Sequence, residues 1–145
     1  MYKSKKYMSV DKNRINQDLK FICENIKKLE ILNRLGEEAF LKDFKNVDST
    51  KYLLRSSIEA VLDLSNYAVI SNGWDMPENI EKTFKVLREK NIIRDFEFEE
   101  YMELVNLKDK LTFMYASIED EFIFNELKKT IIKLKNIKKS LDNLK

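Results

Sequence analysis

Residues 50–71 read TKYLLRSSIEAVLDLSNYAVIS, and apolar residues dominate this stretch. If the stretch is helical, apolar side chains cover most of its sides, and a helix of that kind is usually central and buried. We therefore expect residues 50–71 to form the central helix of an all-α core. The residues that carry this prediction are Leu53, Leu54, Ile58, Val61, Leu62, Leu64, Tyr67, Ala68, Val69 and Ile70.

The segments on both sides of this stretch also predict helices. Apolar residues recur at three- and four-residue steps over residues 10–35, which is the spacing of an amphipathic helix. Residues 37–44 predict a short helix or an extended turn. Three more helices are expected towards the C-terminus: one capped by Asp75, with Pro77 in its first turn, and ending near Lys90; one from Asp95 to near Tyr115; and one capped by Ser117.

The composition supports a bundle of long helices. The 145 residues include only two glycines and one proline, whereas sheet proteins of this length need many tight turns. The length suits one domain with a real core. We expect an all-α, up-and-down bundle of four to five helices in one domain over residues 1–145, with a basic tail over 1–9 and a lysine-rich helix end over 136–145.

The charge is concentrated at the two ends of the chain. Residues 1–14 carry a net +4 and residues 128–145 a net +6, although the whole chain carries only +2. Basic ends can contact RNA phosphates or an acidic partner, and solvated lysines are the common structural alternative. The chain has one cysteine, Cys23, which is compatible with a reducing compartment, and we expect its thiol to pack in the core. No stretch of the sequence has the length of a membrane span. We expect a cytoplasmic protein.

The chain contains no histidine. This excludes histidine-based catalytic triads, the common zinc sites and histidine acid–base pairs. A phosphate-binding loop, a dinucleotide fingerprint, an EF-hand loop and paired cysteines are also missing. The sequence predicts neither a cofactor nor a metal site.

A polar ladder lies on the expected central helix. Arg55, Glu59 and Asp63 follow one another at four-residue steps, so Arg55 and Glu59 are within pairing distance. One interpretation is an ion pair that holds this helix against its neighbours. The other is a supporting shell for a site on the facing helix. The carboxylates could also bind a metal, but two at one spacing are weak evidence for that.

A second pattern lies in residues 106–115, NLKDKLTFMY. Leu104, Leu107, Leu111 and Met114 form one helical stripe that should face the core. Tyr101, Val105, Lys108, Thr112 and Tyr115 form the next stripe. Phe113 falls near Met102 and Asp109, away from the core. An aromatic in this place is either a stray exposed residue or part of a contact with a second subunit, and Met102 beside Phe113 favours the contact.

Residues 57–93, SIEAVLDLSNYAVISNGWDMPENIEKTFKVLREKNII, resemble the middle of HepT-like proteins of the HEPN superfamily. Residues 35–44, LGEEAFLKDF, are similar to the preceding segment of that family, and residues 10–30, VDKNRINQDLKFICENIKKLE, to its first helix. The resemblance extends over roughly residues 10–135. The helix that matches residues 98–115 carries, in the family, an Arg, a polar residue, a His and a Tyr.

These family positions fall on four residues of the present chain. Lys108 stands at the Arg position, Asp109 at the polar position, Phe113 at the His position and Tyr115 at the Tyr position. The resemblance implies a metal-independent ribonuclease toxin that forms homodimers. It also implies an MntA-like nucleotidyltransferase antitoxin that transfers AMP to the motif tyrosine, here Tyr115.

The substitutions change the chemistry that the resemblance implies. Cleavage of RNA requires a base for the 2′-hydroxyl, stabilisation of the phosphorane charge and an acid for the leaving oxygen. Phe113 can exchange no proton, and Lys108 lacks the bidentate fork of Arg. We expect a dimeric HepT-like protein whose catalysis is lost or weak and which binds a nucleotidyltransferase. The alternatives are an active ribonuclease with a divergent site built from Lys108, Asp109, Tyr115 and Glu59, and a structural helical dimer.

Overall fold

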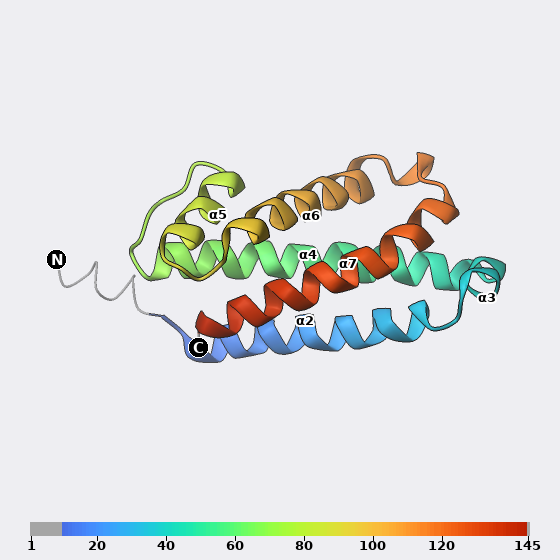
Figure 1. Ribbon diagram of the computed structural model, residues 1–145, viewed down its shortest axis with the longest axis horizontal. Helices are drawn as coiled ribbons and strands as arrows, with labels where there is room; N and C mark the ends of the chain where they lie inside the picture. Colours follow the sequence, from blue (N-terminus) through green and yellow to red (C-terminus); the bar gives the residue numbers. More distant parts are fainter. Residues whose placement is uncertain (1–9, 145) are drawn as a thin grey trace.

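The computed structural model describes residues 10–144; the predicted basic tail over residues 1–9 lies outside the described residues. The four long helices run alongside one another, with α3 and α5 at opposite ends of the bundle (Figure 1). The all-α bundle predicted from the sequence is therefore confirmed. The described helices are α2 (Lys12–Asn33), α3 (Glu37–Lys42), α4 (Phe44–Ser71), α5 (Ile80–Glu89), α6 (Asp95–Phe113), η1 (Tyr115–Ser117), α7 (Asp120–Leu141) and η2 (Asp142–Leu144).

Helix α4 is the central helix, as its sequence predicts. It contacts α2, α3, α5, α6 and α7, and Leu54, Ile58 and Leu64 are fully buried. The helix begins at Phe44, earlier than the predicted start at residue 50. The Asp43 side chain caps it by accepting a hydrogen bond from the backbone N–H of Lys45 at 2.9 Å. Because this cap satisfies an otherwise free donor, the first turn forms ahead of the apolar run.

The predicted start of α5 was wrong. Asp75 was expected to cap the helix, but it accepts only from the adjacent Met76 N–H, and α5 begins at Ile80. The cap is Asn79, whose side chain accepts from the backbone N–H of Lys82 at 2.9 Å. After Trp74, the next apolar side chain that packs against the core is that of Ile80, so residues 75–79 have no such contact to gain by forming a helix turn.

The bounds of the last two long helices were predicted with one error. Helix α6 begins at Asp95, as expected. Helix α7 begins at Asp120 with Glu119 at the cap position, so Ser117 is not its cap. Ser117 lies in η1, where its hydroxyl donates to the carbonyl of Met114 at 3.0 Å. That bond occupies the hydroxyl in the turn between the two helices.

The core-facing side of α6 differs in part from the predicted stripe. Leu104, Leu107 and Leu111 are buried, but Met114 is 53% exposed because α6 ends at Phe113 and Met114 lies beyond its last turn. Tyr101, expected on the neighbouring stripe, is fully buried, with its ring centroid 4.1 Å from that of Phe84. None of the helices in residues 10–144 has the length and apolar character needed to cross a membrane.

Candidate functional site

Lys108 and Asp109 lie on the exposed side of α6 and form an ion pair. The Lys108 Nζ atom is 3.5 Å from the Asp109 Oδ1 atom, and both side chains are partly exposed. An exposed ion pair of this kind contributes little to stability, but the carboxylate offsets the charge that Lys108 could offer to a phosphate. The two polar motif positions therefore partly neutralise each other.

Phe113 and Tyr115 stand at the end of α6 and are both highly exposed. Phe113 is 77% exposed and Tyr115 is 66% exposed. Tyr115 lies outside α6, in η1, so the α-helical spacing used to place it beside Lys108 does not apply to it. Met102, expected to accompany Phe113 at a subunit contact, is only partly exposed and packs against the core instead.

Tyr115 lines a groove between α6 and α4, which we call the Tyr115 groove. Its volume is about 360 Å³, and its lining residues are Lys51, Tyr52, Arg55, Leu111, Thr112 and Tyr115. Lys108, Asp109 and Phe113 are not among them. The structure thus places Tyr115 beside Arg55 of the first polar ladder, in a groove that Lys108, Asp109 and Phe113 do not line.

The predicted pair between Arg55 and Glu59 is confirmed. The Arg55 guanidinium donates to Glu59 at 2.9 Å, with side chains 41% and 45% exposed. The pair lies within α4 and on its outward side, so it does not hold α4 against a neighbouring helix. A second groove, the α4 groove, has a volume of about 370 Å³ and is lined by Arg14, Asp18, Phe21, Tyr52, Arg55, Ser56, Glu59, Ala60 and Asp63.

The two grooves share Tyr52 and Arg55, so they form one continuous surface on α4. Charges in the α4 groove interact across two helices. Partial burial raises the pKa of the Asp18 carboxyl above its usual value, the Arg14 guanidinium opposes that change, and the Asp63 carboxylate adds to it. Asp18 of α2 and Asp63 of α4 are therefore close enough to repel each other.

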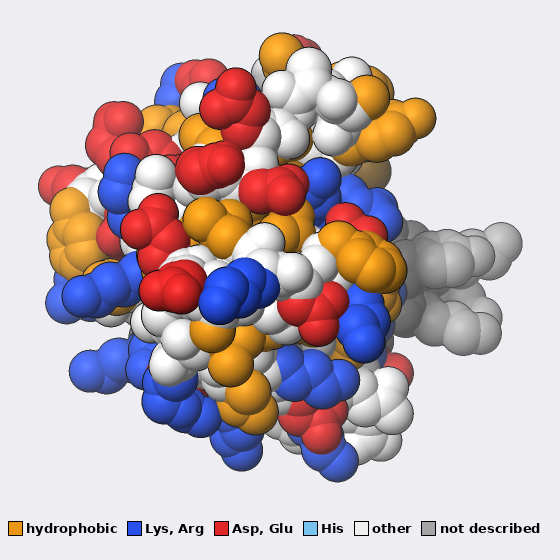
Figure 2. Space-filling view, turned by 90° about the vertical axis from the view of Figure 1, so that its right-hand side faces the viewer, with side chains coloured by type: hydrophobic (Ala, Val, Ile, Leu, Met, Phe, Trp, Pro, Cys, Tyr) orange, Lys and Arg blue, Asp and Glu red, His pale blue; other side chains and the backbone are white. Residues whose placement is uncertain are grey.

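The end of the bundle that carries α3 and η1 has separated charges. Figure 2 views this end directly and shows acidic side chains gathered on its upper left and basic side chains on its lower part, with hydrophobic side chains between them. The exposed acidic residues Glu119, Asp120 and Glu121 stand at the start of α7. Negative charge close to η1 lowers the attraction of this end for a phosphate backbone.

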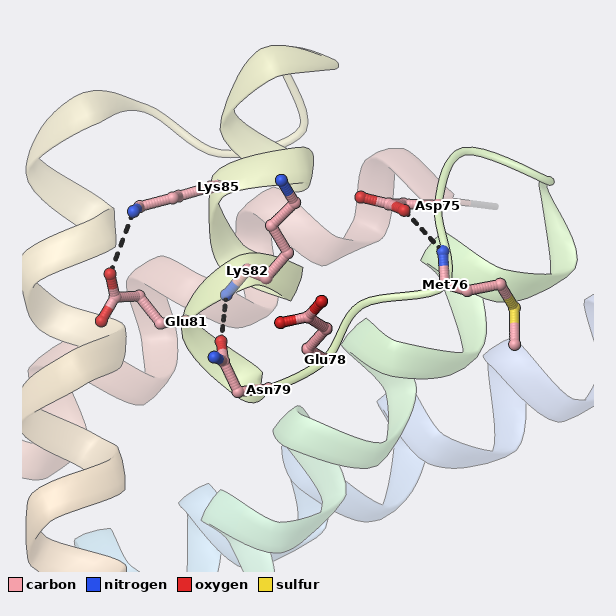
Figure 3. Close-up of a pocket in the computed structure, with 7 residues that line it drawn as sticks. All are labelled: Asp75, Met76, Glu78, Asn79, Glu81, Lys82 and Lys85. Carbon is pink, nitrogen blue, oxygen red and sulfur yellow. Dashed lines mark hydrogen bonds and ion pairs between the residues drawn. The ribbon is translucent and has the colours of Figure 1, made fainter.

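A third hollow lies beside the segment between α4 and α5 (Figure 3). Its polar groups largely bond to one another: Glu81 pairs with Lys85 at 3.0 Å, and Asn79 and Asp75 accept from backbone N–H groups. Within the described residues, no group of three or more carboxylate or thiol side chains is placed to hold a metal ion. The polar groups of this hollow thus cap and flank the start of α5.

The lysines of α7 are mostly paired with carboxylates. Four of its six lysines lie within 4 Å of an acidic oxygen, and these pairs are Lys129 with Glu126, Lys133 with Glu103, Lys135 with Glu30, and Lys138 with Asp142. Two of the pairs tie α7 to α6 and to α2. These lysines are therefore in part structural, which reduces the positive charge that the C-terminal end can offer to RNA.

Several residues that line the two grooves were not predicted as site residues from the sequence. Lys51 stands four residues before Arg55, so the ladder on α4 could have been extended to it. Arg14, Asp18 and Phe21 gave no such signal. Their placement depends on how α2 is aligned along α4 when the two helices pack, and this alignment cannot be read from a single sequence.

Comparison with solved structures shows the same fold in three chains. A chain in a crystal structure of a toxin–antitoxin with AMP-PNP is 17% identical, with a TM-score of 0.76 over 88% of this chain and 97% of that one. YutE, a cytosolic protein of unknown function from Bacillus subtilis, is 15% identical, with a TM-score of 0.76 over 92% and 90%. A chain in a mutant toxin–antitoxin MntA–HpeT is 17% identical, with a TM-score of 0.75 over 90% and 98%.

These identities are low, so the three chains establish a shared fold. No curated protein sequence gives a significant match. The family model described as ribonuclease HepT-like matches residues 22–141, which is most of the chain. The matched range includes the α4 ladder, residues 108–115 and the residues of the Tyr115 groove. The chain therefore belongs to the HepT-like ribonuclease family.

Proposed function

We propose that this protein is a dimeric HepT-like protein whose ribonuclease activity is lost or weak and which acts as the binding partner of a nucleotidyltransferase. The observation that carries the proposal is Phe113. By its resemblance to the family, the chain has Phe113 at the histidine position of the motif, and this side chain is 77% exposed. A phenyl ring accepts and donates no proton, so the acid–base work of RNA cleavage has no group at this position.

The remaining motif residues do not replace that histidine. The Lys108 ammonium pairs with Asp109 at 3.5 Å, and Lys108 lacks the planar fork with which Arg binds a phosphate. Tyr115 lies outside α6 in η1. A neutral phenol is a weak proton acceptor, so Tyr115 is a poor substitute for a histidine base. These properties support a surface for binding rather than for catalysis.

Two structural neighbours support a nucleotidyltransferase as the partner. Both are chains from toxin–antitoxin structures, one with AMP-PNP and one that includes MntA. A partner of this class would need access to the motif tyrosine if it transfers AMP to that residue. Tyr115 meets this condition because it is 66% exposed at the rim of its groove.

The partner proposal is tested by titrating the purified protein with a nucleotidyltransferase encoded by an adjacent gene. Isothermal titration should give saturable binding, and mass spectrometry after addition of ATP should show one added AMP on wild type but none on Tyr115→Phe. Tyr52→Phe, in the same groove, is the matched control and should be modified like wild type. Absence of binding would contradict the proposal, and binding without modification would remove only the role of Tyr115.

A second candidate function is an active endoribonuclease with a divergent site. The observation that favours it is the Tyr115 groove, where Lys51 and Arg55 supply two cationic side chains beside a tyrosine hydroxyl. Arg is well suited to bind a phosphate by two parallel hydrogen bonds. This site would differ from the one expected in the sequence, since Lys108 and Asp109 do not line the groove.

The second candidate predicts cleavage of RNA to products with cyclic phosphate ends. Arg55→Ala should abolish that cleavage, whereas Arg88→Ala, on α5, should leave it unchanged. If wild-type protein leaves RNA intact at micromolar concentration, this candidate is excluded. Binding of RNA by the lysine-rich ends is a separate prediction, and its strength should fall steeply with salt.

A further inference from the structure

The outward side of α4 carries charges in a definite order. Lys51, Arg55, Glu59 and Asp63 follow one another at four-residue steps, so they share one side of the helix. The basic residues stand towards the N-terminal end of this ladder and the acidic residues towards its C-terminal end. Arg55 and Asp63 lie at equal distances on either side of Glu59, about 6 Å each along the helix axis.

A residue from α2 strengthens the acidic end of the ladder. Asp18 lines the α4 groove with Asp63, and the two carboxylates repel each other. The nearby Arg14 guanidinium stacks on the Tyr67 ring, 4.1 Å from its centroid. Tyr67 follows Asp63 by four residues on α4, whereas Glu59 precedes Asp63 by four residues. Two carboxylates thus stand together on an exposed surface, and a further cation placed there would relieve their repulsion.

The ladder is complementary to a reversed copy of itself. If two α4 helices face each other in antiparallel directions about a two-fold axis at Glu59, Arg55 of each subunit comes opposite Asp63 of the other. This is the self-complementary contact that a two-fold dimer requires. The two Glu59 carboxylates then meet at the axis, where each is already paired with Arg55 of its own helix at 2.9 Å, and this pairing offsets their repulsion. RNA fits the surface less well, because Asp18, Glu59 and Asp63 would repel its phosphates.

Uncharged side chains near the proposed axis suit such a contact. Ser56 and Ala60 are small and lie one turn apart on α4, which allows the backbones of two helices to approach closely. Phe21 is 39% exposed and Tyr52 is 55% exposed in the same groove. Apolar area of this kind supplies binding energy, while the charges fix the register of the contact.

We propose that two copies of the chain dock through α4 in antiparallel register about Glu59, with Arg55 of each subunit against Asp63 and Asp18 of its partner. The inference rests on the homodimer of the proposed function and specifies the surface and the register of that dimer. It also places the Tyr115 groove beside the subunit contact, because Arg55 and Tyr52 line both grooves.

The test is a charge exchange between subunits, read by sedimentation velocity. The dimer contains two symmetry-related contacts between residue 55 of one subunit and residue 63 of the other. Arg55→Glu alone places two acidic side chains at each of these contacts. Asp63→Lys alone places two basic side chains at each of them. Each variant should dissociate at concentrations where wild type is dimeric, with a dimer dissociation constant raised about 100-fold or more. Mixing the two variants should restore a dimer, because both contacts are then between opposite charges.

The controls separate this register from the dimer itself. Lys85→Glu reverses a charge on α5 and should leave the dimer intact, and circular dichroism should show that every variant is folded. If both single variants remain dimeric, or if the mixture stays monomeric, the register is wrong although the proposed function stands. If wild type is monomeric, the inference fails together with the homodimer, while binding to the nucleotidyltransferase is judged by its own titration.

Discussion

Arg55 of α4 and Tyr115 of η1 line the same groove, although the two residues come from distant parts of the sequence. Arg55 also pairs with Glu59 within α4 at 2.9 Å and borders the neighbouring α4 groove. Tyr115, which we propose as the motif tyrosine, is thus grouped with the ladder of α4, while Lys108 and Asp109 form an ion pair on α6. This arrangement separates the residues that the family pattern would combine in one site.

A buried carboxylate between α6 and α7 predicts a large loss of stability when its partner is removed. Glu97 is fully buried and accepts hydrogen bonds from the Ser140 hydroxyl at 2.6 Å and from the backbone N–H of Arg94 at 3.1 Å. Ser140→Ala should lower the free energy of unfolding by about 1–3 kcal/mol, because a buried acceptor loses its donor. Urea unfolding measures the change, and Ser117→Ala at an exposed turn should cost less than about 0.5 kcal/mol.

The cap of α5 gives a second prediction, which tests the corrected helix start. Asn79→Ala should lower the free energy of unfolding by about 1 kcal/mol, since its side chain satisfies the Lys82 N–H. Asp75→Ala should change it by less than about 0.5 kcal/mol, because Asp75 bonds only the adjacent residue outside the helix. Equal losses in the two variants would show that the helix begins nearer Asp75.

Glu100 gives a prediction for the pH dependence of stability. Partial burial raises the pKa of the Glu100 carboxyl above its usual 4.5, and the hydrogen bond from Asn136 opposes that rise. In the pH window just above 4.5 the folded state therefore binds more protons than the unfolded state, so this group lowers stability as pH rises through the window. Glu100→Gln should remove that part of the decline.

The comparison for this prediction is a series of urea unfolding curves between pH 4 and pH 7. The difference in unfolding free energy between wild type and Glu100→Gln should grow in favour of the variant as pH rises. Glu99→Gln, on the exposed side of the same helix, is the matched control and should show a smaller change with pH. A difference that stays constant over the range would contradict the raised pKa.

The helices were predictable because their apolar periodicity is strong. The core positions of α2 and α4, such as Leu29 and Leu54, follow from their spacing alone and are fully buried. The ends were less predictable, because caps depend on single hydrogen bonds. Asp75 and Asn79 both fit the residue preference for a cap, and only the three-dimensional position of the first core contact distinguishes them.

The candidate site was predictable in its parts but not in its grouping. The pair between Arg55 and Glu59 follows from a four-residue step within one helix. The groove shared by Arg55 and Tyr115 depends on two further features: the packing of α6 against α4, and the end of α6 before Tyr115. Neither feature can be read from local sequence. The sequence-based prediction therefore extended α6 to Tyr115 and placed this residue on the same helical stripe as Lys108.

The most direct test of the central claim is a comparison of RNA cleavage by wild type with cleavage by the double variant Lys108→Arg, Phe113→His. Both positions are accessible enough to accept the change, since Phe113 is 77% exposed and Lys108 is partly exposed. Restoring a proton-exchanging group should raise the cleavage rate about 100-fold or more. We expect wild type to leave a labelled RNA intact and the double variant to cleave it; cleavage by wild type at the rate of the double variant would contradict the proposed loss of catalysis.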